Sequence, residues 1–87
     1  MKVKNAMGLH TRPATEIVKL LQQFKSKVEI KYKKDTVNAR SILGILMLAA
    51  HQNAVVEVIV EGVDAEVTLE RVKAAFDSNF GEVHAYA

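Results

Sequence analysis

The segment Lys27-Val28-Glu29-Ile30-Lys31-Tyr32 alternates strictly between charged and apolar residues. Successive side chains of a strand point to opposite faces, so this pattern predicts a strand with one buried and one polar face. The segment Thr36–Arg40 repeats the alternation after a turn at Lys33-Lys34-Asp35. Together the two segments predict a β-hairpin whose charged face is open to solvent.

An amphipathic helix is predicted before this hairpin, from Thr11 to Phe24. Its apolar residues recur at the spacing of one helical face, and they are Ala14, Ile17, Val18, Leu21 and Phe24. A short extended segment, Lys2–Asn5, precedes the helix, and Gly8 allows a sharp turn between the two.

Three further elements are predicted after the hairpin: a short helix over Ser41–Ala50, a strand over Ala54–Glu61 and a last helix from Ala65 to Phe80. Ser41 and Asp64 are suited to the N-caps of the two helices. The last helix is expected to bury one apolar face, made of Ala65, Leu69, Val72, Phe76 and Phe80.

The predicted order is β-α-β-β-α-β-α, in which strands have one polar face and helices have one apolar stripe. We therefore expect an α+β fold, an open-faced two-layer sandwich with a four-stranded antiparallel sheet and three helices on one face. The 87 residues suffice for one domain, spanning 1–87. No element is assigned to the tail at 82–87.

Composition excludes several kinds of chemistry. The chain has no Cys, which removes disulfides, thiolate metal sites and a cysteine nucleophile. The longest apolar run, Ile45–Ala50, is far too short to span a bilayer, and no leader segment is evident, so we expect a cytoplasmic protein without membrane insertion. His51 and His84 lack the spacing of metal ligands, so no metal site is expected.

The charges are unevenly distributed along the chain. Residues 1–50 carry ten Lys or Arg against three acids, a net charge of +7, whereas residues 51–87 carry two against seven, a net charge of −5. A basic half of this kind attracts acidic or phosphate-bearing partners.

The stretch Gly8-Leu9-His10-Thr11-Arg12-Pro13-Ala14 carries the predicted chemistry. Proline is favoured in the first turn of a helix, so His10 is expected at or just before a helix N-terminus. The unpaired N–H groups of Thr11 and Arg12 there would attract an anion. The same partial positive charge disfavours a charged imidazole, and the Arg12 guanidinium is suited to phosphate oxygens.

These groups predict a site where a ring nitrogen of His10 attacks phosphorus while donors hold the phosphoryl oxygens. No GxxxxGK[ST] motif is present to bind a nucleotide. The protein would therefore carry a phosphoryl group, without a cofactor, as a transfer intermediate rather than a stand-alone enzyme. The alternative is that His10 is only a capping or surface residue.

The stretch Gly8–Ala14 resembles the active-site signature of the HPr family, the histidine-containing phosphocarriers of the bacterial phosphoenolpyruvate–sugar phosphotransferase system. A second block, Val37–Leu46, resembles the regulatory-serine segment of that family, and the predicted order of elements is also the family's own. Three features depart from the family pattern: no glycine in the turn at Lys33-Lys34-Asp35, Asn53 where glycine is usual, and a tail at 82–87 with no counterpart.

The resemblance implies specific roles. His10 would receive a phosphoryl group from enzyme I, which takes it from phosphoenolpyruvate, and would pass it to a sugar-specific enzyme IIA for sugar uptake. Arg12 and the backbone amides of Thr11 and Arg12 would hold the phosphoryl oxygens. Ser41 would be phosphorylated by an HPr kinase/phosphorylase in bacteria that have one, and a transcription regulator would be a further partner. Ser41 as a plain N-cap stays an alternative.

The helix over Ser41–Ala50 is apolar nearly all round, yet a short helix on a two-layer domain buries one side only. We assign Ile45, Leu48 and Ala49 to the core. The second stripe is assigned to an exposed apolar patch rimmed by basic residues; it consists of Ile42, Leu43, Leu46 and Met47, with Arg12, Lys19, Lys27 and Arg40 at the rim. The positions at which HPr partners bind match Thr15, Lys19, Ile42, Leu43 and Leu46. Burial of both stripes is the alternative.

Three other functions remain to be weighed. The first is a regulatory HPr-like protein that acts mainly through Ser41 in carbon-source control, against which His10 argues. The second is a nucleic-acid-binding domain that uses the basic stretch 25–40, which offers few aromatic platforms and no GXXG clamp. The third is a ligand-sensing module, which would leave the pairing of His10 with Arg12 unexplained. We expect a monomer that binds no nucleic acid.

Overall fold

The computed structural model describes residues 1–81 and is centred on the strand β1, Lys27–Tyr32. This strand has the bounds predicted from its alternating pattern. β2, Asp35–Asn38, and β3, Glu57–Glu61, pair with it in antiparallel fashion, so the strand order is β2-β1-β3. Ile30 on β1 faces Val37 on one side and Val58 on the other.

The sheet has three strands, and the expected four-stranded sheet is not confirmed. The predicted first strand, Lys2–Asn5, forms only an isolated bridge between Lys2 and Val55. Val3 donates its N–H to the Ala54 carbonyl at 2.8 Å and accepts from the Asn53 N–H at 2.7 Å. The chain then bends away, because the Gly8 N–H donates to the Asn5 carbonyl at 3.0 Å and closes a turn.

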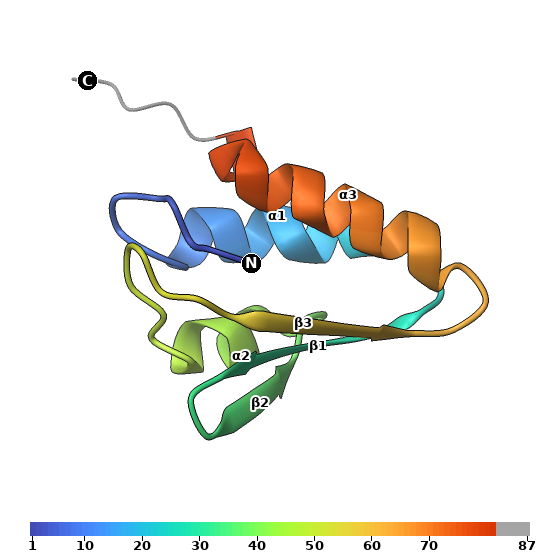
Figure 1. The fold of residues 1–87 in the computed structure, drawn as a ribbon, viewed down its shortest axis with the longest axis horizontal. Helices are drawn as coiled ribbons and strands as arrows, with labels where there is room; N and C mark the ends of the chain where they lie inside the picture. The colour runs from blue at the N-terminus through green and yellow to red at the C-terminus, as the bar shows by residue number, and fades with distance from the viewer. Residues whose placement is uncertain (82–87) are drawn as a thin grey trace.

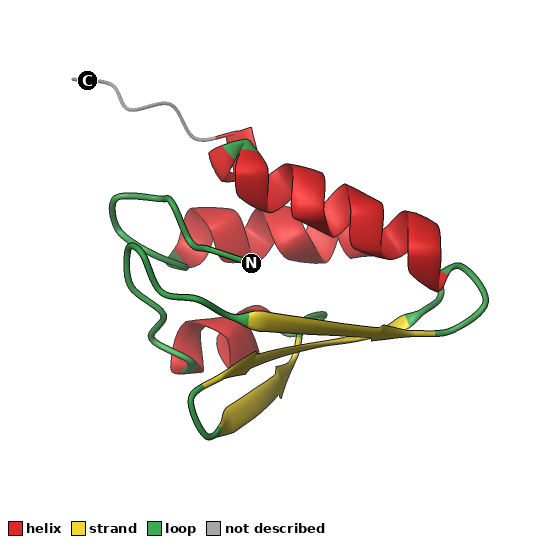
Figure 2. Cartoon of the chain, in the orientation of Figure 1, coloured by secondary structure: helices red, strands yellow, loops and turns green. Residues whose placement is uncertain are grey.

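The three predicted helices are present. α1, Thr11–Leu21, and α3, Ala65–Asp77, lie side by side over the sheet, while α2, Ile42–Met47, packs against α1 and β2 (Figure 1). A single turn of 3₁₀ helix, η1, follows at Asn79–Gly81. Figure 2 shows α1 and α3 as a layer above the strands, whereas α2 lies beside the strands at their own level.

The core lies between these layers and contains most of the predicted residues. The fully buried side chains include Ile17 and Leu21 of α1, Val28 and Ile30 of β1, Ile45 of α2, and Val72 and Phe76 of α3. Leu69 was expected to belong to this group, but it is 41% exposed. Thr68 takes the buried position instead, because its hydroxyl donates to the Asp64 carbonyl at 2.7 Å and needs no water.

Several elements end earlier than predicted. α1 ends at Leu21 rather than Phe24, since the N–H groups of Gln22, Gln23 and Phe24 bond three residues back, as in a 3₁₀ turn. α2 ends at Met47 rather than Ala50, because Ala49 has a φ of 53° and leaves the helical region. α3 ends at Asp77, and Asn79 and Phe80 then adopt left-handed φ values of 58° and 55°.

Two strands are also shorter than predicted. β2 ends at Asn38 rather than Arg40, because the Asn38 side-chain oxygen accepts the Arg40 N–H at 2.8 Å and turns the chain. β3 begins at Glu57 rather than Ala54, whose N–H donates to the His51 carbonyl. The turn before β2 is where it was expected, and without a glycine Lys33 supplies its left-handed φ of 56°.

The helices of residues 1–81 are all too short or too polar to cross a membrane. This observation agrees with the shortness of the apolar runs in the sequence.

The Asp64 carboxylate ties the start of α3 to the loop before β1. It accepts the N–H groups of Lys25 at 2.8 Å and Ser26 at 2.9 Å, together with the Ser26 hydroxyl. Asp64 occupies the N-cap position, but its side chain does not cap α3. The hydrogen bond from the Ser26 hydroxyl, followed by that from the Lys25 backbone, lowers the pKa of Asp64 from 3.8 to about 2.

We expect this carboxylate to contribute to acid stability. Because its pKa is lower in the folded state, its contribution is complete above a pH of about 4 and is lost as the pH falls through about 2. The variant Asp64→Asn should have a lower melting temperature at pH 7 and a smaller further loss between pH 4 and pH 2. Thermal unfolding followed by circular dichroism across this range, with Glu70→Gln as an exposed-acid control, measures both effects. Parallel curves for Asp64→Asn and wild type would contradict this role.

Candidate phosphoryl-transfer site

His10 is the N-cap residue of α1, as the position of Pro13 predicted. Its backbone is extended, with φ −85° and ψ −164°, and its side chain is partly exposed. The ring makes no capping hydrogen bond to α1. The interpretation of His10 as a capping residue therefore finds no support in the geometry.

The first turn of α1 presents two backbone donors beside His10. The first intrahelical bond runs from the Ala14 N–H to the His10 carbonyl at 3.1 Å, and Pro13 has no N–H. In the part of the chain that the structure describes, the N–H groups of Thr11 and Arg12 bond to no carbonyl. An oxyanion placed there would meet these two donors and the positive end of the helix dipole.

Pro13 and Arg12 have contrasting environments. Pro13 is buried and fixes the start of α1 against the core, whereas Arg12 is exposed and remains accessible to an incoming anion. Thr15 is partly exposed and donates its hydroxyl to the Thr11 carbonyl at 2.8 Å, and Lys19, one turn later, lies 3.9 Å from the Glu16 carboxylate.

The segment before His10 is held against the loop that follows α2. The Leu9 N–H donates to the Ala50 carbonyl at 2.8 Å. Gly8 has a φ of 70°, and a Cβ there would lie 2.7 Å from the His51 Cα and closer still to the Ala50 oxygen. Only glycine fits this contact, which brings the start of α1 next to the end of α2.

The exposed side of α2 matches most of the predicted apolar patch. Ile42, Leu43 and Met47 are 37%, 68% and 73% exposed, while Leu46 is partly buried against the core. Ile45 and Leu48 are buried, as expected. Ala49 was assigned to the core and is exposed, because its left-handed backbone turns it away after the last helical turn.

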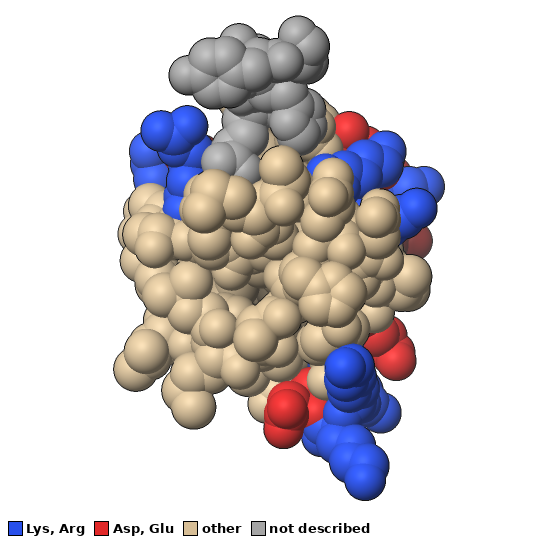
Figure 3. All heavy atoms as spheres, turned by 90° about the vertical axis from the view of Figure 1, so that its left-hand side faces the viewer, with Lys and Arg blue, Asp and Glu red and all other residues tan. Residues whose placement is uncertain are grey.

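This end of the molecule is mainly uncharged. Figure 3 shows it with Lys and Arg side chains along the margin, few acidic ones, and an uncharged centre. The left-hand side of Figure 1, which faces the viewer here, carries the turn before His10, the start of α1 and the loop after α2. An uncharged centre with a basic margin is compatible with a surface that binds an acidic protein transiently.

Arg40 does not belong to the basic rim to which it was assigned. Its guanidinium donates to the carbonyls of Leu21, Phe24 and Ser26 at 2.7 to 2.8 Å. Leu21 is the last residue of α1, where a cation interacts favourably with the helix dipole, and Phe24 and Ser26 lie in the loop before β1. Arg40 is therefore a structural residue, and no local pattern predicted this role because its partners lie up to 19 residues away.

Ser41 occupies the N-cap position of α2, as predicted. Its hydroxyl oxygen accepts the Gly44 N–H at 3.0 Å, and the side chain is partly exposed. A Cβ on Gly44 would lie 3.3 Å from this oxygen, so glycine leaves room at the cap.

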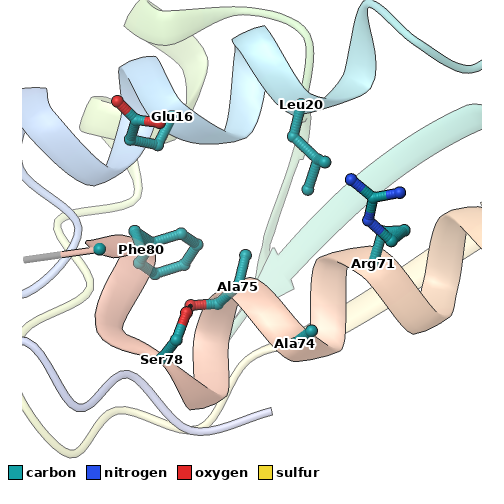
Figure 4. Close-up of a pocket in the computed structure, with 8 residues that line it drawn as sticks. Glu16, Leu20, Arg71, Ala74, Ala75, Ser78 and Phe80 are labelled. Atoms are coloured by element: carbon teal, nitrogen blue, oxygen red, sulfur yellow. Dashed lines mark hydrogen bonds between the residues drawn. The ribbon is translucent and has the colours of Figure 1, made fainter.

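The remaining polar features do not form a second centre. Within residues 1–81, no three His, Asp or Glu side chains group as metal ligands. His51 is exposed and lies 3.4 Å from the Tyr32 hydroxyl through its Nε2, whereas His84 lies outside the described residues. A shallow pocket of about 330 Å³ between α1 and α3 is lined by Glu16, Leu20, Arg71, Ala75 and Phe80, among others, and is separate from His10 (Figure 4).

An imidazole at a helix N-terminus, with two backbone donors and an exposed guanidinium two residues later in the chain, is suited to bind an anion such as a phosphoryl group. The sequence family described as "PTS HPr component phosphorylation site" matches residues 1–78. The phosphocarrier protein HPr of Chlamydia trachomatis is 40% identical over 93% of this chain and 74% of its own length. The chain therefore belongs to the HPr phosphocarrier family of the bacterial phosphotransferase system.

Solved structures agree with this family. HPr-C-His from Thermoanaerobacter tengcongensis is 36% identical, with a TM-score of 0.90 over 95% of this chain and 93% of its own. The Bacillus subtilis catabolite repression containing protein Crh is 32% identical, with a TM-score of 0.78 over 91% of each chain. The α+β fold is thus that of the family, with three helices and an antiparallel sheet.

Proposed function

We propose that His10 accepts a phosphoryl group from enzyme I and transfers it to a sugar-specific enzyme IIA. The position of His10 supports this function most directly, since its partly exposed ring stands at the start of α1 beside the N–H groups of Thr11 and Arg12. Membership of the HPr family supplies the partners. In this proposal the protein acts in the cytoplasm as a monomeric carrier.

In the transfer step, the lone pair of a ring nitrogen of His10 attacks the phosphorus carried by enzyme I. A nitrogen–phosphorus bond forms as the bond from phosphorus to the donor breaks, and the donor keeps the bonding electron pair. Arg12 and the amides of Thr11 and Arg12 bind the phosphoryl oxygens and stabilise their charge. A nucleophile of enzyme IIA then attacks the phosphorus, the nitrogen–phosphorus bond breaks, and the nitrogen keeps the bonding electron pair. His10 thereby returns to its starting state.

We expect His10→Ala to abolish phosphorylation and Arg12→Ala to slow it by about 10- to 100-fold, because a donor to the phosphoryl oxygens is lost. Incubation with enzyme I and labelled phosphoenolpyruvate, followed by measurement of acid-labile, base-stable label, tests both. Arg71→Ala, on α3, is the matched control and should be labelled at the wild-type rate. Label that persists in His10→Ala would show that the carrier residue is another one.

We assign the docking surface to the exposed side of α2 and the adjoining part of α1. This surface consists of Thr15, Lys19, Ile42, Leu43 and Leu46, and it adjoins the His10 segment through the bond from Leu9 to Ala50. Leu43 is the most exposed apolar residue among them, at 68%. Its apolar side chain suits a contact that is buried only while the partner is bound.

The variant Leu43→Asp should raise the KM of enzyme I for this protein roughly tenfold, because an acidic group replaces an apolar contact facing an acidic partner. Val63→Asp is the control, since Val63 is 92% exposed in the turn between β3 and α3, at the opposite end of the fold. Steady-state phosphorylation with unchanged melting temperatures measures the effect. Equal KM values for the two variants would place the docking surface elsewhere.

A regulatory role for Ser41 is the second part of the proposal, and likeness to Crh favours it. A phosphate on Ser41 would stand at the start of α2 and add a charge of about −2 beside Ile42 and Leu43. This charge would repel an acidic partner from the docking surface. Regulation through Ser41 alone, without carrier activity, is the alternative function, and it leaves the His10 site unused.

We expect an HPr kinase/phosphorylase with ATP to place acid-stable label on the wild type and not on Ser41→Ala. Ser78→Ala is the control, since Ser78 is another exposed serine and its hydroxyl donates to a helix carbonyl. Mass spectrometry of the labelled peptides locates the phosphate. Equal label in all three proteins would remove this role from Ser41.

A further inference from the structure

Two methionines stand out on the end of the molecule that carries His10. Met7 is 75% exposed and Met47 is 73% exposed, whereas Met1 is partly buried against the core. These three are the only methionines of the chain. Two of the three thioethers are therefore open to any reagent in solution.

The two exposed methionines flank the contact that joins the His10 segment to α2. Met7 lies in the turn closed by the bond from Gly8 to Asn5, three residues before His10. Met47 is the last residue of α2, three residues before Ala50, whose carbonyl accepts the Leu9 N–H. The turn before α1 and the end of α2 both lie on the left-hand side of Figure 1, which is the side that faces the viewer in Figure 3.

Thioether oxidation would change this face in one step. A hydroperoxide transfers one oxygen atom to the sulfur of methionine, which becomes a sulfoxide while hydrogen peroxide is reduced to water. The sulfur loses two electrons, the peroxide oxygen–oxygen bond breaks, and no other bond of the protein changes. The sulfoxide is polar, so burying it against a partner requires free energy to remove water from its oxygen. This cost is avoided only where the partner supplies a hydrogen-bond donor.

We propose that Met7 and Met47 are oxidation sites at which hydroperoxides weaken docking of the protein that phosphorylates His10. This inference rests on the proposed carrier function and extends the docking surface defined above by Met7 and Met47, on which the regulation would act. Oxidation leaves His10, Arg12 and the start of α1 unchanged, so it lowers the affinity for the phosphorylating protein and not the rate of the transfer step. Enzymatic reduction of the sulfoxides restores the surface, which makes the modification reversible.

The test compares the full-length protein before and after treatment with hydrogen peroxide, which catalase then removes. Peptide mass spectrometry follows sulfoxide formation at each methionine, and phosphorylation by enzyme I gives KM and kcat. We expect Met7 and Met47 to oxidise faster than Met1, and KM to rise roughly tenfold with little change in kcat. Methionine sulfoxide reductases should return KM to its starting value.

The double variant Met7→Leu/Met47→Leu is the matched control, because leucine conserves size and cannot be oxidised. Its KM after peroxide, divided by its own KM before, should be close to one. A wild-type KM that is unchanged by complete oxidation of Met7 and Met47, or an equal rise in the double variant, would overturn the inference alone. If enzyme I fails to label the untreated protein, the proposed function falls and the inference falls with it.

Discussion

The hydrogen bond from the Leu9 N–H to the Ala50 carbonyl, 2.8 Å long, joins the two parts of the chain on which function depends. Together with the packing of α1 against α2, it brings the His10 segment and the apolar side of α2 together, although His10 and Ile42 are 32 residues apart in the chain. Gly8 makes the contact possible, since any side chain there would collide with the Ala50 and His51 backbone. The proposed nucleophile, His10, and the proposed docking surface consequently share one face.

A carrier imposes a constraint that an enzyme with a deep cleft does not have. The phosphoryl group must be reached by two different proteins in turn, so the site has to lie on a convex surface. The observed placement meets this requirement: the start of α1 is exposed, and the pocket of about 330 Å³ between α1 and α3 lies elsewhere. In the proposed function, stabilisation of phosphoryl charge would depend on the backbone donors of Thr11 and Arg12 and on the exposed Arg12 guanidinium, rather than on exclusion of water.

Local sequence patterns predicted most elements and the positions of His10 and Ser41 in the fold, because each of these features depends on neighbours in the chain. The alternation in Lys27–Tyr32 gave β1 with its observed bounds, Pro13 placed His10 at the start of α1, and Ser41 caps α2. Interactions between distant segments escaped prediction. Arg40 was assigned to the basic rim, yet its guanidinium binds the carbonyls of Leu21, Phe24 and Ser26. Asp64 was expected to cap α3, yet its carboxylate binds the N–H groups of Lys25 and Ser26. The missing fourth strand has a similar origin, since the turn at Asn5–Gly8 ends pairing after one bridge.

The loop beside the site is strained and firmly held. Ala49 and Asn53 both have left-handed φ values, 53° and 71°, which cost non-glycine residues of the order of 1 kcal/mol each. Asparagine adopts this conformation more readily than most residues, whereas alanine has no local means of favouring it. The strain persists because the loop is bonded on both sides: Ala50 accepts from Leu9, Ala54 donates to His51, and Asn53 donates to Val3. In the proposed function, a loop fixed in this way would present the same surface to the donor and to the acceptor of the phosphoryl group, as a carrier that serves two partners with one face requires.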